Sequence, residues 1–215
     1  MFTITDEILP PNIEKKIKRR AKDTKRENYP TPQPKQQEFL ETEADIALFG
    51  GAAGSGKSLA ILLDFAKAEL LDRKHYKGVI FRRTYPEIRN EGGLWDESGL
   101  WYSQLGAIAN DSRLLWKFPQ GSTIRFSHLQ HEKNIYSWQG SQVSRVGFDE
   151  LTHFTKKQFF YLLTRMRSPH GITPKLRATC NPDAESWLAE FVEWYINPQG
   201  YPYPERYGVL RWFIV

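Results

Sequence analysis

The sequence GAAGSGKS, from Gly51 to Ser58, lies between a short apolar run and a segment with helical periodicity. It fits the pattern G-x-x-x-x-G-K-S, in which glycines let backbone N–H groups approach phosphate oxygens. The helix that follows offers its positive N-terminus to the same anion. The apolar run at 44–49 is typical of a buried strand, so strand, loop and helix occur in the order that the pattern requires. We therefore expect a phosphate-binding loop here.

Two side chains of this loop have expected roles of their own. Lys57 is placed to reach the β- and γ-phosphates of a nucleotide, and the Ser58 hydroxyl to take a coordination position of Mg²⁺. The expected nucleotide-binding positions of the loop are Gly51, Ala52, Ala53, Gly54, Ser55, Gly56, Lys57 and Ser58.

Two adjacent carboxylates, Asp149 and Glu150, follow a second apolar run at 146–148. Asp149 would hold Mg²⁺ directly or through water, and Glu150 would act as the general base that orients and deprotonates the attacking water. GTPases and small-molecule kinases do not typically need the adjacent glutamate, and the guanine motif Asn-Lys-x-Asp is absent. The pattern therefore favours an ATPase with ATP and Mg²⁺ as cofactors, and with Glu150 and Lys57 as catalytic residues.

Strand and helix patterns alternate around these motifs. Further strands are expected at 78–83, 114–118, 123–127, 144–148, 176–180 and 207–215, with the segments 114–118 and 123–127 forming a β-hairpin. Helices are expected at 12–26, 35–42, 58–71, 156–166 and 187–195, and a loop with a helix at 86–102. The alternation predicts an α/β fold with a mainly parallel central sheet flanked by helices. With the phosphate loop and the acidic pair added, the chain resembles a P-loop NTPase with an added catalytic glutamate, which implies a RecA-like arrangement of the sheet.

Positive charge is concentrated near the N-terminus. The 215 residues carry a net charge of +5, of which residues 1–26 contribute +4. Prolines at positions 30, 32 and 34 indicate a boundary. We therefore expect a basic N-terminal arm at 1–29 and a P-loop ATPase domain at 30–215. Such an arm suits a phosphate backbone, although a solvated helix or tail carries the same charges.

Composition excludes a membrane-spanning helix and an internal disulfide. No stretch of about 18 apolar residues is present, which rules out a membrane-spanning helix and gives no reason to expect a membrane partner. The single cysteine, Cys180, cannot form an internal disulfide and is interpreted as buried packing.

The order of the motifs resembles the ATPase domain of a large terminase subunit, the DNA-packaging motor of tailed bacteriophages. The resemblance covers roughly residues 30–213, and its matching segments in order are 34–40, 51–58, 81–89, 139–141, 146–150, 154–159, 164–169 and 178–182. It implies ATP hydrolysis that drives translocation of double-stranded viral DNA into a preformed capsid. It also implies a portal protein and a small terminase subunit as partners. The active form is expected to be a homo-oligomeric ring, a pentamer, whereas the isolated domain can be a monomer. The expected location is the host cytoplasm during virus assembly.

The resemblance implies roles for further residues. Gln36 looks like the adenine-reading glutamine of the family, and Thr179 and Asn181 look like its coupling motif, which senses the γ-phosphate. The family also uses an arginine to stabilise charge on the transferred phosphoryl group. This chain has Gln139 where many relatives carry a basic residue before a glycine. The remaining arginine-finger candidates, acting in this chain or on a neighbouring subunit, are Arg82, Arg83, Arg145, Arg165 and Arg167.

Two other functions share the same ATP chemistry. One is a helicase or repair-type DNA-dependent ATPase core, which needs two such modules in tandem where this chain has one. The other is a nucleotide-dependent switch that binds ATP without productive hydrolysis. Full-length members of the resembled family carry a metal-dependent nuclease domain after the ATPase. No spaced set of aspartates suited to two metals occurs here, so the chain is expected to be a fragment without the nuclease domain or its activity.

Overall fold

The computed structural model describes residues 30–181, 183, 185–199, 201, 203–206 and 209. The expected arm at 1–29 with its helix at 12–26, and all of the expected strand at 207–215 except Val209, lie outside the described residues. The chain divides into two compact units, Met1–Thr31 and Pro32–Val215, and the second unit contains all of the motifs.

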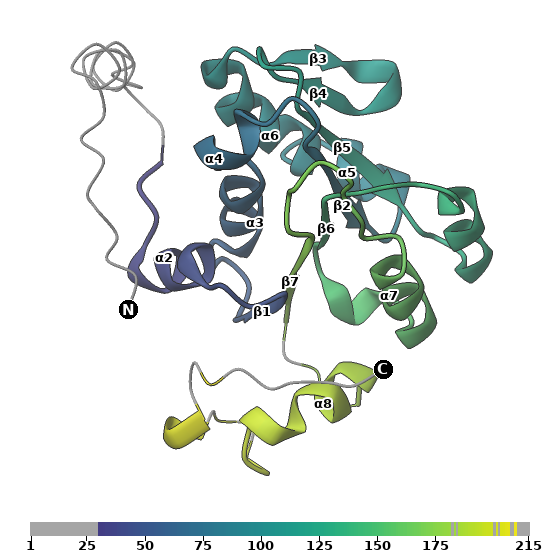
Figure 1. The fold of residues 1–215 in the computed structure, drawn as a ribbon. Helices are drawn as coiled ribbons and strands as arrows, with labels where there is room; N and C mark the ends of the chain where they lie inside the picture. The colour runs from purple at the N-terminus through teal and green to yellow at the C-terminus, as the bar shows by residue number, and fades with distance from the viewer. Residues whose placement is uncertain are drawn as a thin grey trace, which may run out of the picture. The chain divides into compact units, whose positions relative to one another are not determined.

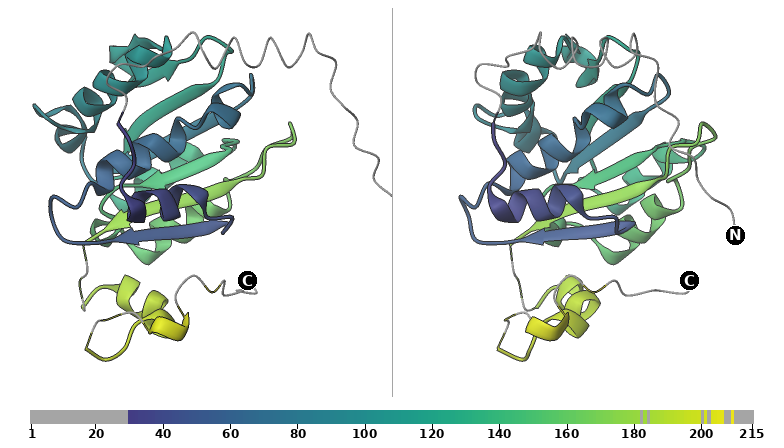
Figure 2. Two further views of the ribbon diagram at one scale, coloured as in Figure 1. Left: turned by 90° about the vertical axis from the view of Figure 1, so that its left-hand side faces the viewer. Right: turned by 60° about the vertical axis from the view of Figure 1, so that its left-hand side comes forward.

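A seven-stranded sheet forms the centre of the second unit. Its strands are β1 (Ile46–Gly50), β2 (Lys77–Arg82), β3 (Ile108–Asn110), β4 (Leu115–Lys117), β5 (Thr123–His128), β6 (Arg145–Phe148) and β7 (Lys175–Cys180). Their order is β1-β7-β6-β2-β5-β4-β3, and the first five are parallel. Figure 2 shows β1, from early in the chain, beside β7, from near its end. The expected α/β fold with a mainly parallel sheet is confirmed, as is the hairpin, which is formed by β4 and β5.

Helices cover both faces of this sheet, and α3 and α7 lie on opposite sides of it (Figure 1). The helices are α2 (Pro34–Glu41), α3 (Lys57–Phe65), α4 (Ala68–Leu71), α5 (Tyr85–Arg89), α6 (Leu94–Tyr102), α7 (Lys156–Leu163) and α8 (Trp187–Val192). Within the described ranges, no helix is long and apolar enough to cross a membrane.

One expected helix, 58–71, is divided in two. The backbone leaves the helical region at Lys67, with φ −59° and ψ 137°, and the chain resumes as α4. At this break the Lys67 ammonium pairs with Asp64 at 3.0 Å and donates to the Leu40 carbonyl oxygen. The expected helix 187–195 also ends early, at Val192, and continues as a 3₁₀ turn.

The core lies on both sides of the sheet because strand residues alternate between its faces. In β2, Ile80 packs with α3 and α6, whereas Val79 and Phe81 pack with α7 and β6 on the other face. The helix α3 approaches the sheet closely at Gly147, where a Cβ atom would lie 2.8 Å from Cζ of Phe65. A larger residue at this position would therefore push α3 away from the strands.

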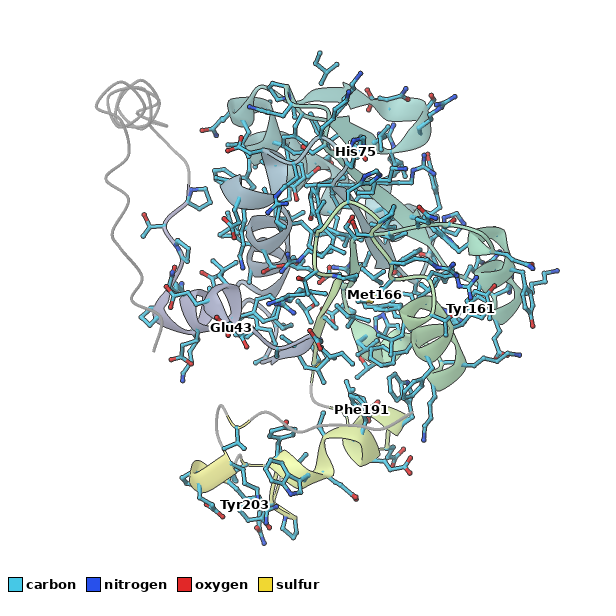
Figure 3. The ribbon with its side chains drawn as sticks, in the orientation of Figure 1. Glu43, His75, Tyr161, Met166, Phe191 and Tyr203 are labelled. Carbon is cyan, nitrogen blue, oxygen red and sulfur yellow. The ribbon has the colours of Figure 1, made fainter. Side chains whose placement is uncertain are left out.

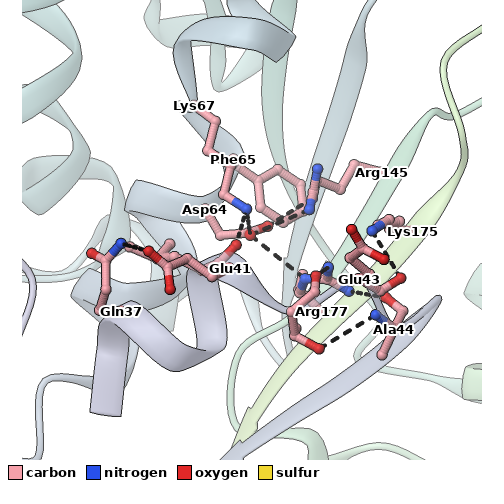
Figure 4. Close-up of polar contacts among 12 residues, drawn as sticks. Gln37, Glu41, Glu43, Ala44, Asp64, Phe65, Lys67, Arg145, Lys175 and Arg177 are labelled. Atoms are coloured by element: carbon pink, nitrogen blue, oxygen red, sulfur yellow. Dashed lines mark hydrogen bonds and ion pairs between the residues drawn. The ribbon is translucent and has the colours of Figure 1, made fainter. Parts of the chain in front are cut away.

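A buried ionic cluster joins α3 to the beginnings of β6 and β7 (Figure 4). The Asp64 side chain is 0% exposed and pairs with Arg145 Nε at 2.7 Å and with Arg177 Nε at 3.5 Å. Arg177 also donates to the carbonyl oxygens of Ala44 and Thr42, and desolvation is the main cause that lowers its pKa. Removing the carboxylate would leave buried cations without a counter-charge, so the cluster fixes how these elements pack.

The strand order determines which motifs meet. The loop Gly51–Gly56 follows β1, Asn181 follows β7 and Asp149 follows β6, while β2 ends at Arg82. These four strands are adjacent and parallel, so their carboxyl ends share one edge of the sheet. Ligands of open α/β sheets bind at that edge.

Candidate active site

The loop between β1 and α3 is exposed at its tip and anchored at its base. Residues 52–55 are exposed, and the Gly51 N–H donates to the Cys180 carbonyl oxygen at 3.2 Å. Gly54 and Gly56 have φ angles of 77° and 73°, a region that costs residues with a Cβ atom. The two glycines thus allow the turn that directs the chain into α3.

Lys57, the first residue of α3, has its ammonium group surrounded by oxygen atoms. Nζ donates to the carbonyl oxygens of Gly51 at 2.9 Å and Ala52 at 2.8 Å, and to Asn181 Oδ1 at 2.8 Å. An ammonium has three protons to donate, so these acceptors match its capacity. The structure therefore brings Asn181, expected from the coupling motif, into direct contact with the lysine of the loop.

The Asp149 side chain connects three elements of the site, α3, β2 and β7. It is 0% exposed, and it accepts from Ser58 Oγ at 3.3 Å and from Arg82 Nη2 at 2.6 Å. The Thr179 hydroxyl donates to its other oxygen. Hydroxyl and carboxylate oxygens are ligands that Mg²⁺ prefers, so Ser58 and Asp149 fit the expected ion, with Arg82 as a competing cation.

Glu150 has an unusual backbone for a residue that is not glycine. Its φ and ψ are 60° and 61°, a strained conformation that costs on the order of 1–3 kcal/mol. The Glu150 N–H donates to Thr179 Oγ1 at 3.1 Å, and its carbonyl oxygen accepts from the His153 N–H at 3.0 Å. Its Oε2 atom is buried without a hydrogen-bond partner among the described residues. The strained backbone thus sets where the Glu150 carboxylate lies, and the hydrogen bond to Thr179 helps to hold that backbone.

Gln36 lies against the same loop through both ends of its amide. Oε1 accepts from the Gln33 N–H at 2.8 Å, and Nε2 donates to the Gly56 carbonyl oxygen at 2.8 Å. The side chain is 2% exposed. Its adenine-reading role stays a prediction, while its observed contacts join α2 to the start of α3.

The five arginine-finger candidates lie in different places. Arg82 contacts Asp149, whereas Arg83 donates to the Leu129 carbonyl oxygen and to Gln158. Arg145 is wrong as a candidate, because it is buried in the Asp64 cluster at the opposite end of β6. The other two are placed as follows: Arg165 packs over the Tyr161 ring at 5.2 Å, and Arg167 is exposed near the start of β2.

One acidic residue near the site was not expected from the sequence. Glu97 of α6 is partly buried, and its pKa is raised by burial and by Asp149, with Arg82 opposing the shift. No local pattern marks it, since Glu97 and Asp96 look like ordinary acidic residues in the first turn of a helix. The interpretation of Cys180 is confirmed: burial, with a contribution from Glu150, raises the pKa of this thiol to about 11, and Lys57 opposes the shift.

Comparison with known proteins agrees with this geometry. The family described as Terminase large subunit, T4likevirus-type, N-terminal matches residues 48–211. The chain belongs to this family. The match includes the loop, the acidic pair and the segment of Thr179 and Asn181. The search of curated proteins found no match.

Solved terminases share the fold. The large terminase of the thermophilic bacteriophage D6E superposes with a TM-score of 0.63 at 15% identity, covering 76% of this chain and 43% of its own. The large terminase ATPase domain of Thermus phage P74-26 gives 0.58 at 17% identity, covering 80% and 72%. The HK97 bacteriophage large terminase gives 0.56 at 13% identity, covering 76% and 36%. The chain thus spans less than half the length of the D6E and HK97 terminases, and these similarities concern the fold.

Proposed function

We propose that the chain is the ATP-hydrolysing motor domain of a terminase that drives double-stranded DNA into a preformed capsid. The observation that carries this proposal is the convergence of Lys57, Ser58, Asp149 and Glu150 at one edge of the sheet in a member of the terminase family. Two solved structures of the D6E large terminase, described as complexes with ADP and with ATP-γ-S, support an adenine nucleotide as the ligand.

Each residue of the site has a part in phosphoryl transfer. The loop N–H groups and the Lys57 ammonium would bind the phosphates, and Lys57 would exchange some of its present oxygen contacts for phosphate oxygens. Glu150 would accept the proton of the attacking water, because its Oε2 has no competing donor among the described residues. Mg²⁺, held by Ser58 and Asp149, would supply charge neutralisation between the phosphates.

Coupling to movement would run through the same contacts. Asn181 bonds Lys57, and Thr179 bonds both Asp149 and the Glu150 backbone. A phosphate that attracts Lys57 would therefore also change the hydrogen-bond partner of Asn181, the residue that follows β7. The contacts of one chain do not test the remaining parts of this proposal. These parts are the arginine finger, the pentameric ring, the portal and small-subunit partners, and the host cytoplasm as location.

A packaging reaction tests the whole proposal. The terminase that contains this domain is mixed with preformed capsids, viral DNA and ATP, and the DNA that becomes resistant to nuclease is measured. Protected DNA that requires ATP, and that disappears with Glu150→Gln, would support the proposal. Equal protection with Glu150→Gln would contradict it, and hydrolysis without any protected DNA would favour a different DNA-dependent ATPase.

A further inference from the structure

A cluster of basic side chains lies at the start of β2. It consists of Lys74, His75 and Lys77 from the chain entering β2, and Arg167 and His170 from the segment between α7 and β7. All five are exposed. His75, labelled in Figure 3, stacks on His170 with ring centroids 3.8 Å apart. We call these five residues the β2-entry cluster.

Backbone pairing holds the two segments of the β2-entry cluster together. The Arg167 N–H donates to the Val143 carbonyl oxygen at 3.1 Å, and the Ser144 N–H donates to the Lys77 carbonyl oxygen at 2.9 Å. Residues 143–144 therefore bridge Arg167 to the start of β2. The positions of Lys77 and Arg167 therefore follow from the sheet rather than from a free loop.

The positive charge of the β2-entry cluster is not balanced. None of its side chains forms an ion pair within the described part of the chain, whereas exposed Lys156 and Lys157 pair with Glu190 and Glu132. His170, burial, Lys74 and Lys77 all lower the pKa of His75, and no carboxylate among the described residues opposes them. An anion at this place would meet an uncompensated positive potential.

A small recess inside the cluster has the lining of a phosphate contact. Its volume is about 40 Å³, and its walls include Gln142, Ser144 and Ser168 beside the basic residues. Ser168 Oγ is buried without a hydrogen-bond partner among the described residues. Pockets for small molecules are roughly 300–1,000 Å³, so the recess is far too small to enclose one and serves as a contact point for part of a larger anion.

We propose that the β2-entry cluster binds the phosphate backbone of double-stranded DNA, an inference that rests on the proposed function. Lys, Arg, Ser and Gln are side chains that contact DNA phosphates without reading sequence, as a packaging motor requires. An acidic protein partner fits less well, because Pro169 alone supplies apolar lining to the recess, and protein interfaces have an aromatic and apolar centre.

The cluster is distant from the ATP site. Lys77 begins β2 and Arg82 ends it, and five residues of strand extend about 17 Å at roughly 3.3 Å each. Substitutions at Lys74 and Lys77 would therefore alter DNA binding while leaving the basal rate of ATP hydrolysis unchanged.

The test measures how salt changes the affinity for a short fluorescein-labelled DNA duplex, by anisotropy. The variant is Lys74→Gln with Lys77→Gln, and the control is Lys156→Gln with Lys157→Gln, which removes the same charge from lysines that already have carboxylate partners. Each lost phosphate contact reduces the slope of log K against log salt by about 0.9, so the variant should lose about 1.8 and the control much less. The 215-residue chain is used throughout, so the N-terminal arm contributes equally to every sample.

Three results have distinct meanings. A reduced slope in the variant alone, with unchanged hydrolysis of ATP, would support the assignment. Equal slopes in the variant and the control would overturn it and leave the proposed function standing. Absence of duplex binding by the unsubstituted chain would contradict DNA as the partner and therefore this surface as well.

Discussion

Replacing Thr179 with valine removes one hydroxyl that serves two residues of the active site. The Thr179 hydroxyl donates to Asp149, which is buried, and accepts from the Glu150 N–H at 3.1 Å. Valine has nearly the same shape, so the change leaves no cavity. A hydrogen bond to a charged group contributes about 1.5–3 kcal/mol and a neutral one about 0.5–1.5 kcal/mol. Together they predict a loss of about 2–4.5 kcal/mol in the free energy of unfolding.

The same change should slow turnover more than it weakens nucleotide binding. Without the bond to Thr179, the Glu150 backbone can relax from its strained φ of 60°, and its carboxylate would move away from the water that it is proposed to activate. A displacement of about 1 Å at a catalytic group can cost on the order of a hundredfold in rate. The apparent KM for ATP should change little, because the loop and Lys57 remain intact.

Urea unfolding and steady-state ATP hydrolysis measure both effects. Thr179→Ser is the matched control, because it keeps the hydroxyl and removes a methyl group worth about 0.8 kcal/mol. We expect the serine variant to retain most of the turnover. If valine and serine variants had the same kcat and the same stability, Thr179 would not hold Glu150 and the reasoning would be refuted.

Three further predictions follow from other contacts. Lys57→Ala should weaken binding of an ATP analogue at least about tenfold by calorimetry, whereas Lys67→Ala should not, because Lys57 lies in the loop where the phosphates would bind and Lys67 pairs with Asp64. Asp64→Ala should lower the free energy of unfolding by about 3–5 kcal/mol, since it leaves buried arginines unpaired, and a loss under about 1 kcal/mol would count against that cluster. Cys180, with a pKa of about 11, should resist alkylation at pH 8 and react after unfolding in urea, and rapid labelling of the folded chain would contradict its burial.

The sequence predicted those parts of the site that depend on local patterns. The loop at Gly51–Ser58 needs a strand before it and a helix after it, and both are visible in the periodicity of neighbouring residues. The acidic pair follows β6 for the same reason. The adjacency of Lys57 and Asn181, 124 residues apart, could not come from spacing and rested on the resemblance to terminases.

Two predictions failed because of tertiary contacts, and one strand was not expected because no local pattern marks it. Arg145 looked available as an arginine finger, but its partner Asp64 lies 81 residues earlier and is buried with it. The helix expected at 58–71 breaks at Lys67, whose helical propensity is good, where its side chain contacts Asp64 and Leu40. β3 has three exposed residues and therefore no apolar alternation to reveal it.

The measurement that tests the account most directly is ATP turnover by Glu150→Gln, with binding of an ATP analogue measured on the same sample. Glutamine preserves the shape of the side chain but cannot accept the proton of the attacking water. A general base contributes about 10²–10⁴-fold to rate, so turnover should fall by that factor while binding is retained. Turnover equal to that of the unsubstituted chain would contradict the assignment of Glu150 and the proposed mechanism of the motor.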